Sequence, residues 1–212
     1  MALNLFFPCL GFCSDSESTR VDVGLFSESR LEHWEEKEFE AKTLYRLVQV
    51  DGQTVLAGEA DASASGLFKK VGVDLRKTPF LNWSWRVENA HPPLDETTKS
   101  GDDYAARIYL VKDGGLIFWK TIALNYVWSS SQARGHFWPS SYAGDNVILM
   151  ALRSRDDGVG KWYVEKRNVY ADFKQLFGKE IDRIDAVAVM TDSDNSNGNA
   201  KAYYGDIYFT SE

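Results

Sequence analysis

The chain has 212 residues and a formal net charge of −7, and 44% of its residues are hydrophobic and 14% aromatic. This length suits one large β domain or two small ones, and the apolar content is enough for a core without a disulfide or a metal. The acidic balance and the lack of a Lys/Arg cluster disfavour nucleic acid or an anionic membrane surface as a partner.

The first residues have the composition of an export leader. The apolar stretch from Leu3 to Cys13 is about as long as the hydrophobic part of a signal peptide and too short for a transmembrane span. No Lys or Arg precedes it, and Phe12 stands where a lipoprotein signal has a small residue before its cysteine. We therefore expect a leader at residues 1–19 and a periplasmic or exported protein, with a cytoplasmic protein as the alternative. Cys9 and Cys13 are the two cysteines, so neither a disulfide framework nor a Cys/His zinc site is expected in the rest of the chain.

From residue 20 onward, short segments of alternating apolar and polar residues predict β-strands. The expected strands cover residues 21–26, 43–50, 53–61, 67–75, 80–88, 103–111, 116–128, 146–154, 161–170, 184–191 and 201–210. Tight hairpin turns are expected at VDGQT (50–54) and VKDGGL (111–116). A short helix or turn is expected within 27–40, anchored by Trp34, and a helical turn at 171–178, closed by Gly178. The pattern predicts a single all-β domain over residues 20–212, a two-sheet antiparallel β-sandwich of jelly-roll or galactose-binding-like type with one or two short helices.

Side-chain alternation separates a core face from a possible ligand face. Leu81, Trp83, Trp85 and Val87 share one face of the strand at 80–88 and are interpreted as core. If the strands at 80–88, 103–111 and 116–128 are neighbours, their other faces combine aromatic rings with fixed hydrogen-bonding groups, which suits a sugar. The candidate ligand-binding residues are Arg86, Arg107, Tyr109, Trp119 and Asn125. The alternative is an ordinary solvated sheet face.

The run MTDSDNSNGNAKAYYGDIYF, residues 190–209, places acids and amides between two strand patterns. Hard cations bind carboxylate and amide oxygens, so Asp192, Asp194 and Asp206 are candidate ligands for a structural calcium, with Asp102 and Asp103 as potential partners. An EF-hand loop is excluded, because Gly198 at its sixth position would put Ser193 first and Tyr204 twelfth. The alternative is a long turn, since Asn, Asp, Ser and Gly favour turns for local backbone reasons. No cofactor is required by either interpretation.

Catalysis has weaker support in the sequence. His136, Tyr142 and Glu165 are candidates for proton transfer on a polysaccharide. No G-x-S-x-G motif, phosphate-binding glycine loop or dinucleotide fingerprint accompanies them. The favoured hypothesis is a non-catalytic module that binds carbohydrate or cell-envelope glycan. The alternatives are a polysaccharide lyase or hydrolase and a scaffold that binds a protein partner.

Five segments together resemble an uncharacterised bacterial family, the domain-of-unknown-function family 3047 (DUF3047). They are LNWSWRV, GDDYAARIYLV, LNYVWSS, KWYVEKRNVYADF and VAVMTDSDNSNGNAKAYYGDIYF, in order between about Phe39 and Phe209. The resemblance implies an exported protein of a Gram-negative bacterium, and it implies no activity and no catalytic residue. SGLFKKVGVDLRKTPFLNWSWRV and GDIYF are more distantly similar to galactose-binding-like jelly rolls, which implies a fold and no ligand.

Overall fold

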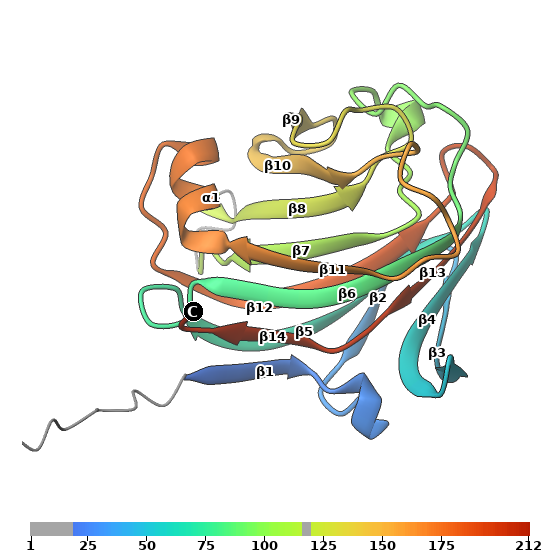
Figure 1. The fold of residues 1–212 in the computed structure, drawn as a ribbon. Coiled ribbons are helices and arrows are strands. Elements are labelled where there is room, and N and C mark those ends of the chain that lie inside the picture. Colours follow the sequence, from blue (N-terminus) through green and yellow to red (C-terminus); the bar gives the residue numbers. More distant parts are fainter. Residues whose placement is uncertain (1–18, 116–119) are drawn as a thin grey trace, which may run out of the picture.

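The computed structural model describes residues 19–115 and 120–212 (Figure 1). The expected leader therefore lies outside the described residues, except for Thr19. The described chain forms two β-sheets that pack against each other, so the predicted all-β sandwich is confirmed.

Sheet A, as described, has seven strands in the order β1-β14-β6-β13-β4-β3, and β11 also pairs with β6. The strands are β1 (Arg20–Gly24), β3 (Leu44–Val50), β4 (Gln53–Asp61), β6 (Phe80–Asn89), β11 (Tyr163–Asn168), β13 (Asn199–Tyr204) and β14 (Ile207–Thr210). All of its pairings are antiparallel. The long strand β6 pairs with β11 along one edge and with β13 and β14 along the other, so it is an interior strand of this sheet with three partners.

Sheet B, as described, also has seven strands, in the order β2-β5-β12-β7-β8-β10-β9. They are β2 (Glu35–Glu40), β5 (Ala64–Asp74), β7 (Arg107–Lys112), β8 (Ile122–Trp128), β9 (Phe137–Ser140), β10 (Gly144–Arg153) and β12 (Arg183–Asp192). One pairing differs from the antiparallel prediction, because β10 runs parallel to β8. The chain between these strands supplies β9, which then pairs antiparallel with the outer edge of β10.

The helical elements that the structure describes in full are two 3₁₀ turns, η1 (Phe26–Glu28) and η2 (Lys99–Gly101), and one helix, α1 (Val169–Phe177). The predicted helical turn is confirmed: the Asn168 side chain caps its start, and Gly178 ends it with a φ of 64°. The prediction of a short helix or turn within 27–40 is wrong for the second half of this range. Residues 35–40 form β2, an exposed edge strand that pairs with β5, because their backbone groups gain partners in the sheet.

The two predicted hairpin turns have different outcomes. Asp51 and Gly52 both have positive φ, 52° and 82°, and they join β3 to β4 as expected for an Asp-Gly turn. The tight turn expected at 111–116 is wrong in length. Strands β7 and β8 do pair antiparallel, but the connection runs from residue 113 to 121.

Aromatic side chains fill the space between the sheets. Trp83 of β6 stacks on Tyr126 of β8, with ring centroids 5.5 Å apart and an interplanar angle of 14°. Trp85 packs edge to face against Trp128, with ring centroids 6.1 Å apart. Leu81 and Val87 are also fully buried, so the predicted core face of this strand is confirmed.

Buried polar groups also connect the two sheets. Glu165 on β11 accepts hydrogen bonds from Trp85 Nε1 at 3.1 Å and from Arg153 Nε of β10 at 2.6 Å. In the same layer, Asp172 of α1 accepts hydrogen bonds from the Tyr126 hydroxyl and from Arg167. These contacts satisfy polar atoms that would otherwise be buried without partners. Among the described residues, no helix has the length and apolar composition to cross a membrane.

Replacement of Glu165 by Gln should destabilise the fold, since it leaves the largely buried Arg153 guanidinium without that carboxylate. We expect the free energy of unfolding to fall by about 3 kcal/mol, measured by urea denaturation. The control is Val164→Thr at the neighbouring position, which is 78% exposed and should change stability by less than about 0.5 kcal/mol. Equal effects of the two variants would show that Glu165 does not hold the sheets together.

Candidate functional site

A pocket of about 520 Å³ lies on the face of sheet B that points away from sheet A. Ile108 and Leu110 of β7 point into the core, so alternation places Arg107 and Tyr109 on the opposite face. The strand register sets Tyr109 beside Asn125 of β8 on this face. The lining residues are Phe39, Glu40, Ala64, Asp102, Arg107, Tyr109, Asn125, Ser140, Tyr142, Ala143, Val147, Leu149, Met190, Asp192, Asp194 and Asn195.

Three aromatic rings contribute to the pocket from separate elements. Phe39 comes from the edge strand β2, Tyr109 from the central strand β7, and Tyr142 from the turn between β9 and β10. Phe39 and Tyr142 are 59% and 58% exposed, whereas Tyr109 is partly buried. The two exposed rings thus offer apolar surface at the rim of the pocket, and Tyr109 contributes deeper in it.

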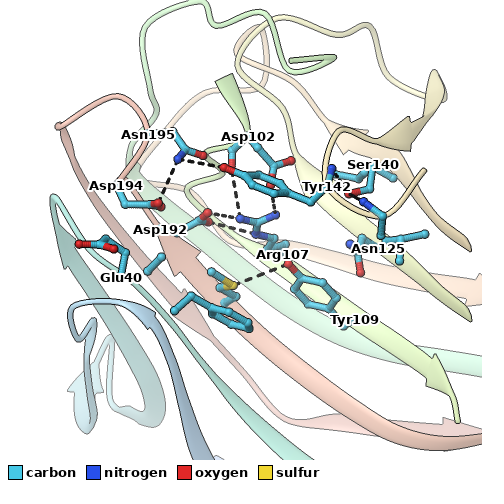
Figure 2. A pocket seen from close by; sticks show the side chains of 16 residues that line it. Glu40, Asp102, Arg107, Tyr109, Asn125, Ser140, Tyr142, Asp192, Asp194 and Asn195 are labelled. Carbon is cyan, nitrogen blue, oxygen red and sulfur yellow. Dashed lines mark hydrogen bonds and ion pairs between the residues drawn. The ribbon is translucent and has the colours of Figure 1, made fainter. Parts of the chain in front are cut away.

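A buried ion pair between Arg107 and Asp192 forms part of the pocket wall (Figure 2). Arg107 Nε donates to Asp192 Oδ1 at 3.0 Å, and Nη2 donates to the other carboxylate oxygen and to the Asp102 carbonyl. Burial raises the pKa of Asp192 above its ordinary value, although the Arg107 guanidinium lowers it and the nearby Asp103 raises it further. Both carboxylate oxygens and much of the guanidinium are occupied by partners within the protein.

The polar run after β12 is a turn held by a carboxylate from elsewhere in the chain. Asp103 accepts hydrogen bonds from the backbone N–H groups of Asn195 at 3.1 Å and Ser196 at 2.6 Å. On the other side, His91 Nε2 donates to the Asp192 carbonyl oxygen at 2.9 Å, and burial lowers the pKa of His91. The turn thereby presents Asp194 and Asn195 to the pocket, and the Asn195 amide lies 3.3 Å from the Tyr142 hydroxyl.

The structure groups a different set of carboxylates from the one predicted to bind a metal ion. Carboxylate oxygens of Asp103, Asp192 and Asp194 lie within 4.8 Å of one another. The prediction that Asp206 is a third ligand of this cluster is wrong. Asp206 lies between β13 and β14 of sheet A, where it accepts hydrogen bonds from the backbone N–H and the hydroxyl of Ser27.

The contacts of this cluster do not favour calcium, which prefers six to eight oxygen ligands. Asp192 is paired with Arg107, and each oxygen of Asp103 already accepts a backbone N–H. A cation would have to share these oxygens and lie beside a guanidinium. Calcium at this place stays a prediction of the sequence, and the contacts of the cluster count against it.

Three of the five predicted ligand-binding residues come together in the pocket: Arg107, Tyr109 and Asn125. Arg86 does not line the pocket, because its strand β6 belongs to sheet A. The prediction that this strand neighbours the strands of Arg107 and Asn125 is therefore wrong. The Arg86 side chain is paired with Asp51 and Glu88 instead. Trp119 lies outside the described residues.

The three candidate catalytic residues do not converge. Tyr142 lines the pocket. His136 is exposed, and its ring stacks on Trp138 at 5.7 Å without lining the pocket. Glu165 is buried in its ion pair with Arg153.

Sequence reasoning missed Phe39 and Glu40 as pocket residues, because the segment 27–40 was interpreted as a helix or turn. The signal was weak: EEKEFE has a single apolar residue and shows no strand alternation. His91 was also missed, since a lone histidine in a loop gives no indication of a buried backbone contact.

The contacts of the acidic cluster generate a prediction about calcium. We expect the melting temperature of the wild-type protein to be the same, within about 1 °C, in calcium and in chelator, since Arg107 and backbone amides already occupy Asp192 and Asp103. Differential scanning fluorimetry measures this directly. A rise in calcium that Asp194→Ala removes, and that the off-cluster control Asp206→Ala retains, would establish a calcium site.

Comparison with solved structures finds matches at very low sequence identity and with TM-scores below 0.5. The family 11 carbohydrate-binding module from Clostridium thermocellum, in complex with a β-1,3-1,4-mixed-linked tetrasaccharide, is 10% identical with a TM-score of 0.47, over 91% of this chain and 94% of that chain. The endoglucanase cel12A from Rhodothermus marinus is 8% identical with a TM-score of 0.44, over 91% of this chain and 98% of that chain. A search of curated proteins finds no match.

The sequence itself identifies the family. The model of the family described as "Protein of unknown function (DUF3047)" matches residues 32–208, which is most of the chain and includes β2 through the first half of β14. The matched range contains every residue that lines the pocket. The resemblance seen in the sequence motifs is thus confirmed: the chain belongs to the DUF3047 family.

Proposed function

We propose that this chain is a non-catalytic module that binds carbohydrate in the pocket on the outer face of sheet B. The observation that carries the proposal is the combination of Phe39, Tyr109 and Tyr142 with fixed polar groups in one open pocket. Aromatic rings contact the apolar C–H faces of sugars, and side-chain amides and carboxylates bind their hydroxyl groups. The volume lies within the range of small-molecule pockets, roughly 300–1,000 Å³.

The rigidity of the polar groups supports recognition. Asn125 lies on β8, an interior strand of sheet B, and the ion pair with Asp192 fixes Arg107. Asp194 and Asn195 lie on a turn whose backbone is held by Asp103. Because these groups are already ordered, binding costs less side-chain entropy than it would on a mobile loop.

A polysaccharide-acting enzyme is the second candidate. Burial raises the pKa of Asp194 above its ordinary value, as is useful in a general acid, and Tyr142 lies in the same pocket. The separation of His136 and Glu165 from the pocket favours the non-catalytic proposal. The proposal also places the protein outside the cytoplasm, with the apolar segment near residues 3–13 as its support.

Removal of the rim ring should weaken glycan binding. We expect Tyr142→Ala to reduce the affinity for a bound oligosaccharide about tenfold, because a ring contact of this kind contributes roughly 0.5–1.5 kcal/mol beyond its buried area. Isothermal titration calorimetry on an oligosaccharide found by array screening measures the effect. The control is Phe137→Ala, which removes a ring that is 46% exposed and lies outside the pocket lining.

Incubation of the protein with the bound oligosaccharide should leave the oligosaccharide intact. Chromatography of the mixture after prolonged incubation tests this expectation. A new product whose formation requires Tyr142 or Asp194 would establish the enzyme instead. If the folded protein binds no glycan and yet captures a defined protein partner through Tyr142, the scaffold hypothesis replaces both.

A further inference from the structure

We propose that the sugar bound in this pocket carries a protonated amine, so that the module selects amino sugars over anionic glycans. The inference rests on the proposed function and names its ligand class. It depends on three features of the pocket: the charge of its lining, the kind of hydrogen-bonding atom left without a partner, and the position of the aromatic rings.

The described lining is strongly acidic. The acidic lining residues are Glu40, Asp102, Asp192 and Asp194. Arg107 is the single base among the described lining residues. Arg107 is already bound to Asp192 and lies 3.5 Å from a carboxylate oxygen of Asp102. An anionic sugar such as a uronate would therefore meet uncompensated negative charge, and a cationic sugar would be attracted.

Among the described residues that line the pocket, the buried side-chain atoms that lack hydrogen-bond partners are acceptors. Asn125 is 2% exposed and lines the pocket, and its amide oxygen Oδ1 has no hydrogen-bond partner in the described part of the chain. Asp102 Oδ1 is also buried and has no hydrogen-bond partner among the described residues. Buried polar atoms are normally satisfied, so these two oxygens point to a ligand that donates.

An ammonium group is the donor that fits best, because it offers three N–H groups and no acceptor. The guanidinium of Arg107 is engaged with Asp192 and Asp102, so the pocket offers few strong donors of its own to an acceptor-rich ligand. The pocket therefore presents mainly acceptors, which is the complement of an amine and not of a carboxylate.

The rings and the outer carboxylates are placed to hold such a group. Asp194 is half-buried on the ordered turn, and Glu40 is exposed on β2; both are labelled in Figure 2, with Tyr142 above the Arg107 site. Cations are attracted to the faces of aromatic rings. The Lys99 ammonium already takes this position at the Tyr142 ring, 5.1 Å from its centroid, so the ring is left to contact the apolar face of the sugar and the carboxylates to pair with the amine.

The test compares four β-1,4- or α-1,4-linked tetrasaccharides by titration calorimetry on the full chain, in chelator, at about pH 6, where sugar amines are largely protonated. The probes are tetramers of glucosamine, N-acetylglucosamine, glucose and galacturonic acid. The first two differ only in the acetyl groups that remove the charge. We expect the glucosamine tetramer to bind at least about tenfold more tightly than the two neutral tetramers, with a preference that falls as salt is raised.

Variants separate the charge from the ring. Asp194→Asn keeps the size of the side chain and should lower affinity for the glucosamine tetramer about tenfold, with little effect on the neutral tetramers. Tyr142→Ala should weaken the cationic and neutral tetramers alike. Asp22→Asn is the charge-matched control, because it removes an exposed carboxylate from β1 of sheet A and should leave every affinity unchanged.

The outcomes distinguish the two proposals. Equal binding of the charged and acetylated tetramers, or a preference that Asp194→Asn does not reduce, would overturn the amine and leave the carbohydrate module. Tightest binding of the galacturonic acid tetramer would overturn it as well. If circular dichroism shows folded protein and none of the four tetramers binds, both the amine proposal and the proposed function are wrong.

Discussion

The aromatic packing between the sheets determines which surface of sheet B is free to bind a ligand. Trp83 stacks on Tyr126, and Trp85 meets Trp128, so the faces of β6 and β8 that carry these rings must point at each other. Because strand side chains alternate, this packing sends Asn125 to the opposite face of β8. The buried contact between Glu165 and Arg153 fixes the same two layers. The pocket is thus a consequence of how the core is filled.

The electrostatics of the pocket follow from one buried ion pair and the acids around it. Arg107 and Asp192 satisfy each other, so their charges are not offered to solvent. Asp103 uses both of its oxygens to hold the turn after β12. The lining atoms that stay without partners are acceptors, and they lie among carboxylates and aromatic rings. A donor-rich ligand complements such a set, whereas an anion does not.

Several parts of this arrangement were predictable from local sequence. The alternation in LNWSWRV identified the core face of β6, Asp51-Gly52 identified a hairpin, and Gly178 identified the end of α1. Arg107, Tyr109 and Asn125 were grouped correctly because they lie on consecutive strands that pair. Arg86 was grouped with them wrongly, since the next strand back along the chain crosses to the other sheet. The same limit applies to Asp206, which is 12 residues from Asp194 in sequence and lies between two strands of sheet A.

The sequence by itself determined the class of fold, the core face of β6, the Asp51-Gly52 hairpin and the membership of the family, because each depends on local pattern and on residues in order along the chain. The tertiary structure alone decided that β10 runs parallel to β8, that an acidic edge strand brings Phe39 and Glu40 to the pocket, and that Asp103 reaches the turn after β12. These features join segments distant in sequence. Their pairing depends on which backbone and polar groups satisfy one another in space, and periodicity within one strand carries no information about the partner of that strand.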